Sequence, residues 1–229
     1  MILKYYGHST FNANTKGKNL LFDPFITPNS NTHGLVDINT LEVDYILVTH
    51  GHFDHIADVI AIAQRTNAMV ITTSEVGKWF ESKGLKNVHK MDIGGAFDFE
   101  FGLVKCVYAA HSSSMPDGNY GGNAAGFVVS NDEISFYYAG DTALTLEMQL
   151  VAMTCPTLDF AILPIGDNFT MGYKDAITAA DFIQCQTIVG CHFDTFDVIK
   201  IDSEDAQKVF TDAGLELLLP KINDEYEWN

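Results

Sequence analysis

The sequence predicts an α/β fold in which two similar halves pack as one domain. Short apolar runs, partly β-branched, alternate with helical stretches along the whole chain. These elements follow the order β-rich, α/β, β-rich, α/β. At 229 residues, 47% hydrophobic and 19% charged, the chain is long and apolar enough for an ordinary globular core. We find no sequence repeat, so element order alone supports the two halves, and residues 1–229 are treated as a single domain.

The first half begins with a predicted β-meander over residues 1–25. Lys16-Gly17-Lys18-Asn19 forms a turn between two strands, and Asp23-Pro24 ends the second of them. Turn-forming residues predict a surface loop over 26–40. The remaining elements are a strand at 43–48, a helix at 56–66, a strand at 69–72 and a helix through Ser82 that Ser74 caps at its N-terminus.

The second half repeats this order. Strands at 97–101 and 103–110 lie on either side of Gly102. Strands at 124–130 and 133–139 pair across Asn131-Asp132, a dipeptide that favours a hairpin turn. The alternating elements that follow are a helix at 143–152, a strand at 160–163, a helix at 174–184, a strand at 187–189, a helix at 203–213 and a strand at 215–219.

Charge and hydropathy exclude several classes of function. Lys and Arg number 13 against 30 Asp and Glu, which gives a net charge of −17. Such a field repels nucleic acid and disfavours anionic membranes. No run of about 18 apolar residues indicates a membrane span, and residues 1–6 read as a first strand rather than a signal peptide. We therefore expect a cytoplasmic protein with a small-molecule substrate and neither a nucleic-acid nor a membrane partner; no oligomeric state is predicted.

The four cysteines contain no C-x-x-C pair. In a cytosolic protein, free and buried thiols are then expected. Cys191 is next to His192, which is one of the candidate site residues.

Residues 50–55, His50-Gly51-His52-Phe53-Asp54-His55, carry the densest group of ligand side chains in the chain. Three imidazoles and one carboxylate are good ligands for borderline transition metals. The preceding residues 45–48 read as a buried strand, which places the ligands on a loop at the end of that strand. This pattern indicates a metal site rather than a polar turn.

Four further ligand-type residues follow predicted strands: His111, Asp141, Asp167 and His192. A lone histidine at a strand end is weak evidence for a ligand. Repeated placement of His or Asp at the same end of several strands, beside the compact 50–55 motif, predicts one shared site.

With these residues the chain resembles the metallo-β-lactamase superfamily of metal-dependent hydrolases. The matching motif is His50-x-His52-x-Asp54-His55, followed in order by His111, Asp141 and His192, and the match covers nearly the whole chain. Stretches such as Gly7-His8-Ser9-Thr10 and Phe169-Thr170-Met171-Gly172 are similar to small bacterial hydrolases related to ascorbate-6-phosphate lactonase. The resemblance implies a four-layer αβ/βα sandwich with two mixed sheets face to face.

The resemblance also implies a two-metal site. Its ligands would divide into a first ion held by His50, His52 and His111, a second held by Asp54, His55 and His192, and a bridge formed by Asp141. Zn or Mn is the expected metal, with Fe, Co or Ni as alternatives. Two ions roughly 3.5–4 Å apart lower the pKa of bound water to about 7. Hydrolysis by a metal-bound hydroxide follows, with Asp54 and Asp141 as catalytic residues.

Substrate contacts are predicted from the loops around this site: His8, Ser112, Asn168 and Thr195. A purely structural role stays open for His8. Relatives usually read Pro-x-His-Tyr-Asn-Thr-Phe around the last ligand, where this chain has Gly-Cys-His-Phe-Asp-Thr-Phe at 190–196. A hydroxyl is lost there and an amide has become a carboxylate, so contacts outside the ligands differ.

The expected activity is hydrolysis of a small ester, lactone, amide or phosphoester, with a lactonase-like reaction favoured. A phosphodiesterase or nuclease of the ribonuclease Z type is an alternative that the acidic charge disfavours. An iron-dependent oxygen enzyme is another, although di-iron relatives typically carry a carboxylate at the position of His52. The last alternative is a non-catalytic, metal-binding regulatory module.

Overall fold

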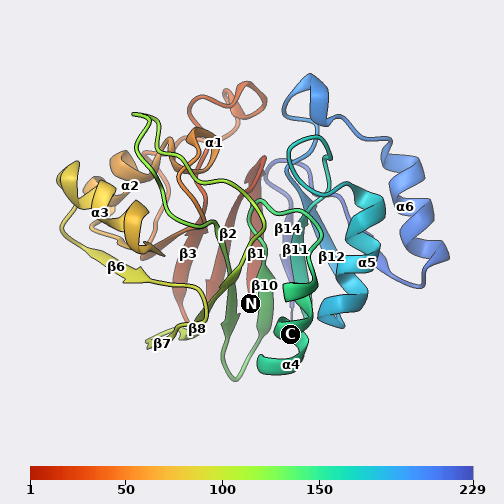
Figure 1. The fold of residues 1–229 in the computed structure, drawn as a ribbon. Helices are drawn as coiled ribbons and strands as arrows, with labels where there is room; N and C mark the ends of the chain where they lie inside the picture. The colour runs from red at the N-terminus through yellow and green to blue at the C-terminus, as the bar shows by residue number, and fades with distance from the viewer. Residues whose placement is uncertain (229) are drawn as a thin grey trace.

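Residues 1–228, which the computed structural model describes, form two halves with a similar order of elements (Figure 1). The first half starts with a meander, as predicted, and continues with alternating strands and helices. Its elements are β1 (Ile2–Gly7), β2 (Thr10–Thr15), β3 (Lys18–Phe22), the 3-10 helix η1 (Ser30–Thr32), β4 (Tyr45–Val48), α1 (Phe53–Ile56), α2 (Val59–Thr66), β5 (Met69–Thr73), α3 (Ser74–Ser82) and β6 (Val88–Met91).

The second half begins with four antiparallel strands and then alternates helices with parallel strands. Its elements are β7 (Ala96–Phe99), β8 (Gly102–Tyr108), β9 (Ala125–Ser130), β10 (Ser135–Tyr138), η2 (Leu146–Met148), α4 (Gln149–Thr154), β11 (Phe160–Pro164), α5 (Tyr173–Ile183), β12 (Thr187–Cys191), η3 (Asp197–Ile199), α6 (Ser203–Asp212) and β13 (Glu216–Leu218). A last strand, β14 (Glu225–Glu227), returns to the first half and pairs antiparallel with β1.

Each half contributes one mixed sheet. Over the described residues, the seven strands of the first sheet lie in the order β14-β1-β2-β3-β4-β5-β6, and those of the second in the order β13-β12-β11-β10-β9-β8-β7. In both, antiparallel strands lead into a parallel run, from β3 to β6 and from β10 to β13. The parallel strands end at the same edge of their sheet, which is where side chains from separate loops can meet.

The two sheets pack face to face, and helices cover both outer faces (Figure 1). Aromatic rings fill the space between the sheets: the Phe22 ring lies 4.7 Å from that of Tyr138 and 5.9 Å from that of Phe136. On the outside, Ile62 and Phe80 of α2 and α3 cover the first sheet. Phe210 of α6 covers the second. The predicted four-layer αβ/βα sandwich is confirmed.

The helix predicted at 56–66 is wrong in its extent. The structure has two short helices, α1 and α2, that break at Ala57-Asp58. The Asp58 carboxylate accepts the N–H groups of Ile26 and Thr27 at 2.6 and 2.9 Å. These bonds hold the start of the 26–40 loop against the break. Asp54 and His55 therefore lie on a helical turn rather than on the open loop that was predicted.

Other boundaries also differ from prediction. The helix through Ser82 has Thr73, not Ser74, as its N-cap, and the Ser74 hydroxyl instead donates to Asp92 at 2.8 Å. The helix predicted at 143–152 is η2 followed by α4, which ends at Thr154. Strands β6 and β14 were not predicted, because each is only three or four residues long and largely polar. Among the described helices, none is long and apolar enough to cross a membrane.

Candidate metal centre

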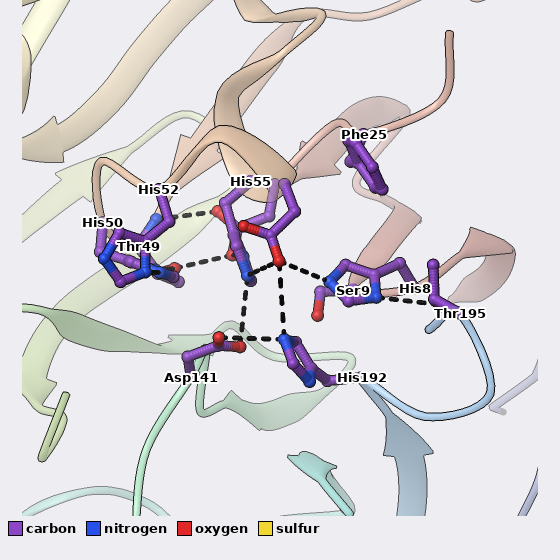
Figure 2. Close-up of polar contacts among 12 residues, drawn as sticks. His8, Ser9, Phe25, Thr49, His50, His52, His55, Asp141, His192 and Thr195 are labelled. Carbon is purple, nitrogen blue, oxygen red and sulfur yellow. Dashed lines mark hydrogen bonds and ion pairs between the residues drawn. The ribbon is translucent and has the colours of Figure 1, made fainter. Parts of the chain in front are cut away.

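The seven predicted ligands meet at one edge of the sandwich, where loops from both halves converge. The first half supplies the loop after β4 and the turn α1, and the second supplies the loops after β8, β10 and β12. The side chains brought together are His50, His52, Asp54, His55, His111, Asp141 and His192. Figure 2 labels His50, His52, His55, Asp141 and His192 among them.

The first group of ligands comprises His50, His52 and His111, whose candidate ligand atoms lie within 4.8 Å of one another. His50 Nε2 lies 3.0 Å from His52 Nδ1. Burial lowers the pKa of His50 well below its ordinary value, and His55 lowers it further. His50 is therefore neutral, and its Nδ1–H donates to Thr49 Oγ1 at 2.9 Å, which leaves the Nε2 lone pair facing the group.

The second group comprises His8, Asp54, His55 and His192, again within 4.8 Å. Burial opposes protonation of His55, but Asp141 and Asp23 raise its pKa well above the ordinary value. Burial likewise opposes protonation of His192, whose pKa Asp141 and Asp54 raise to about 9. The imidazoles of this group are thus buried and face the partly exposed Asp54, whereas His52 and His111 of the first group are only half-buried.

Asp141 lies between the two groups. Its Oδ1 is 3.3 Å from His55 Nε2, and its Oδ2 is 3.1 Å from His192 Nε2 and 3.5 Å from His111 Nε2. Burial acts to raise the pKa of this carboxyl, but His192 and His55 hold it well below its usual range. One ionised carboxylate therefore reaches ligands of both groups.

Two buried polar atoms that face each other at this centre, His55 Nε2 and Asp141 Oδ1, lie 3.3 Å apart and make no hydrogen bond within the described residues. An unpaired buried polar atom typically costs about 1–3 kcal/mol. Imidazole nitrogens and carboxylate oxygens that converge without partners are the donor set of borderline divalent ions. The residues present therefore fit a metal centre.

Asp23 is a functional residue that the sequence reasoning missed. Its buried carboxylate accepts hydrogen bonds from the Thr49 N–H at 2.9 Å, the Thr49 hydroxyl at 2.7 Å and the Tyr138 hydroxyl at 2.9 Å. It also faces His55 Nδ1 at 2.8 Å. Nδ1–H donation to a carboxylate fixes the imidazole so that Nε2 points at a metal. Asp23 follows β3, so the strand-end rule that identified the other ligands applied to it as well.

His8 is buried at the turn between β1 and β2. It contacts Asp54, which was predicted as a metal ligand, and Thr195, which was predicted as a substrate contact. Its Nε2 is 3.1 Å from Asp54 Oδ2, and its Nδ1 is 2.9 Å from Thr195 Oγ1 (Figure 2). Burial, followed by repulsion from His192, lowers the pKa of His8 to about 4. The neutral ring donates from Nε2 to the carboxylate and accepts the Thr195 hydroxyl at Nδ1, so both nitrogens are occupied.

The backbone ties this turn to the second half. His8 and His192 both adopt left-handed φ angles, 54° and 53°, which non-glycine residues rarely do. The His192 N–H donates to the His8 carbonyl at 3.0 Å, and their rings lie 4.2 Å apart. Strain of this kind persists where surrounding contacts fix it, and it is concentrated at functional sites.

The other predicted contacts are placed differently. Ser112 lines a cavity of about 300 Å³ over the ligands, and its hydroxyl is 3.4 Å from His52 Nε2. Asn168 is exposed, and its neighbour Phe169 lines that cavity instead. Asp167 is also exposed and belongs to none of the ligand groups. Cys191 packs in the core between the sheets, and burial raises the pKa of its thiol well above the ordinary value.

The chain is similar to a known protein family and to relatives that it matches over nearly their full length. The family described as the beta-lactamase superfamily domain matches residues 18–193. A UPF0173 metal-dependent hydrolase of Christiangramia forsetii is 50% identical over 99% of this chain and 100% of its own length. A relative of the same description from Flavobacterium johnsoniae is 48% identical over the same shares of both chains.

Solved structures with the same fold include a metallo hydrolase from Ignicoccus hospitalis. It has a TM-score of 0.89 and 28% identity, and the match covers 100% of this chain and 99% of that one. An isothiocyanate hydrolase from Delia radicum gut bacteria has a TM-score of 0.78 at 20% identity, over 100% of this chain and 99% of its own. The second likeness concerns the fold alone.

Proposed function

Because the chain belongs to the metallo-β-lactamase superfamily, within the UPF0173 metal-dependent hydrolases, we propose that it hydrolyses a small ester, lactone, amide or phosphoester at a two-metal centre. Among these substrates, we favour a lactone. The observation that carries the proposal is Asp141, whose two oxygens reach imidazoles of both ligand groups at 3.1–3.5 Å. A bridging carboxylate is what two neighbouring divalent ions require.

The ligands would divide as the two groups suggest, with His50, His52 and His111 on one ion, Asp54, His55 and His192 on the other, and Asp141 on both. Divalent ions in such a site supply Lewis acidity and lower the pKa of water to about 7. Zn and Mn remain the metals we favour for a His/Asp set.

Asp54 is the residue we assign to proton transfer. It lines the cavity and is partly exposed there, so the attacking water can reach its carboxylate. Burial acts to raise the pKa of Asp54, but hydrogen bonds from His192 and His8 hold it well below its usual range. The ionised Asp54 accepts a hydrogen bond from water, orients it, and passes the proton toward the leaving group.

We assign His8 to positioning Asp54 rather than to binding substrate or metal. Both of its ring nitrogens already have partners in the chain, Asp54 and Thr195. His55 Nε2, in contrast, has none within residues 1–228. His8, which is not among the residues that line the cavity, therefore holds the Asp54 carboxylate from a turn that the His192 backbone fixes.

Metal analysis coupled to a hydrolysis screen tests the proposed function. We expect about two divalent ions per chain, and hydrolysis of at least one ester or lactone that chelation abolishes. Asp141→Asn and His192→Ala should reduce the metal content and lower the rate by more than the 10–100-fold typical of residues behind a ligand. Asp167→Asn is the matched control, since this aspartate also follows a strand but lies outside the ligand groups. Full activity and two ions in Asp141→Asn would refute the assignment.

The role of His8 is tested separately with His8→Asn, because asparagine tolerates the left-handed φ at this position. We expect unchanged metal content and KM, with kcat lower by roughly 10-fold, since an outer partner of a catalytic group is lost. His8→Gln, which reaches further, should recover part of kcat. Loss of one metal ion in His8→Asn would instead make His8 a ligand.

A further inference from the structure

The cavity over the metal ligands has an uneven wall. Its polar part consists of His52, Asp54, His111, Ser112, Asp141 and His192. Its apolar part consists of two phenyl rings, Phe169 and Phe196, which are 54% and 39% exposed. A soluble protein gains no stability from exposed phenyl rings, and such rings gathered at a cavity typically mark a binding surface.

Phe196 also belongs to an aromatic cluster that reaches beyond the cavity. Its ring lies 6.4 Å from that of the buried Phe25 and 5.5 Å from that of His8, and Phe25 lies 5.9 Å from Phe53, which is 55% exposed. Phe25 in turn lies against His8 (Figure 2). We call Phe169 and Phe196, the two exposed rings that line the cavity, the aromatic rim. Because Phe196 contacts His8, the rim adjoins the residue that positions Asp54.

Cations are absent from this cavity. No lysine or arginine lines it in the part of the chain that the structure describes. Arg65 is the one arginine in the sequence, and its guanidinium donates to the backbone carbonyls of Ile38 and Leu41. Lys221 lines a different cavity, of about 610 Å³, which shares no lining residue with this one. Phosphate and carboxylate groups of ligands are normally recognised by arginine or lysine.

From the aromatic rim, we infer that the substrate carries an apolar group of about phenyl size beside the bond that is cleaved. This inference rests on the proposed function and narrows it. The polar wall with its ions takes the ester, lactone or amide group. Phe169 and Phe196 take the apolar substituent, whereas an anionic group of a substrate would find its cationic partner in the proposed ions and not in a side chain of the cavity.

Three methyl esters with one small leaving group test the inference: methyl phenylacetate, methyl acetate and monomethyl malonate. In each, water adds to the carbonyl carbon, the bond to methoxy oxygen breaks, and methanol and an acid form. With the metal-loaded protein, we expect kcat/KM for methyl phenylacetate to exceed that for methyl acetate by at least ~10-fold. Monomethyl malonate, which carries a charged group in place of the ring, should be hydrolysed more slowly than methyl phenylacetate.

The double variant Phe169→Ala/Phe196→Ala should lower the ratio of kcat/KM for phenylacetate over acetate by about 10–100-fold. Phe97→Ala is the matched control, because Phe97 on β7 is 47% exposed but lies outside the cavity, and the ratio should not change. Phe169→Ala alone, on an exposed loop, should lower the ratio in the same direction if the double variant fails to fold. An unchanged ratio in folded variants, or a preference for the malonate ester, overturns the inference and leaves hydrolysis itself standing.

Calorimetry with the acids separates failure of the two proposals. Phenylacetate should bind to the wild-type protein at least ~10-fold more tightly than acetate, which has the same carboxylate without the ring, and Phe169→Ala should remove that preference. If no ester is hydrolysed but this preference is found, the hydrolytic function is wrong and the apolar site is supported. If phenylacetate binds no more tightly than acetate, the inference about the apolar group is overturned.

Discussion

The two ligand groups contain similar side chains but are held in different ways. In the first group, His52 and His111 are half-buried at the cavity. In the second, His55 and His192 are almost fully buried, and His55 lies between the carboxylates of Asp23 and Asp141. The difference shows that Asp23, from outside the ligand set, fixes the buried His55, whereas His52 and His111 are half-buried at the cavity.

The largest contrast is expected between His55→Ala and His111→Ala in metal-free protein. Removing His55 leaves two buried carboxylates without their shared cation, and breaking a buried pair typically costs about 3–5 kcal/mol. Removing the neutral, half-buried His111 should cost about 1 kcal/mol or less. Urea unfolding of chelator-treated proteins measures both. Equal losses of stability would mean that the two groups are held alike.

Asp23→Asn should weaken metal binding without removing a ligand. The amide keeps the size of the carboxylate but no longer orients His55 and Thr49 as a charged acceptor. We expect metal affinity to fall by about 10–100-fold, as for other carboxylates behind a metal-bound histidine. Competition with a chelating dye measures the affinity, with Asp167→Asn as the control. Unaltered affinity would show that burial alone orients His55.

The smallest effect is expected for Thr195→Val, which removes the hydroxyl that bonds His8 Nδ1. One such hydrogen bond is worth about 1 kcal/mol, or roughly 5-fold in kcat. Thr195→Ser should retain the wild-type rate, because its hydroxyl is kept. Steady-state kinetics on an ester that the protein hydrolyses measure kcat and KM. A change confined to KM would mean that Thr195 contacts the substrate, as first predicted from the sequence.

Much of the fold could be predicted from the sequence, because the strands that build the sandwich are apolar runs bounded by turn residues. The pairing of β9 with β10 and the parallel strand β11 are examples, although the turn spans 131–134 rather than the predicted Asn131-Asp132. Strand β14 could not be predicted, because its residues Glu-Tyr-Glu join the sheet only by pairing with β1 at the far end of the chain. The break before α2 also depends on a distant contact, that of Asp58 with the 26–40 loop.

The site was predictable where a strand carries a ligand directly to its end. His111, Asp141 and His192 follow this rule, and the structure brings them together. Asp167 also follows a strand in the sequence, but it does not join the other ligands. Gly166 bridges to Gly172, and the loop between them leaves Asp167 exposed at φ 62°. The hydrogen bond between His8 and Asp54 could not be predicted from the sequence, because it depends on the turn geometry that brings two distant loops into contact.

The hydrogen bond from the His192 N–H to the His8 carbonyl joins the two halves at the metal centre. During synthesis, the motif at 50–55 is made long before His192, and domains fold slowly when their contacts join distant parts of the chain. A nascent first half can therefore offer three histidines and an aspartate to an ion, but neither the bridge nor the last ligand. Under the proposed ligand assignment, the complete two-metal site would therefore form only after both halves have folded and docked.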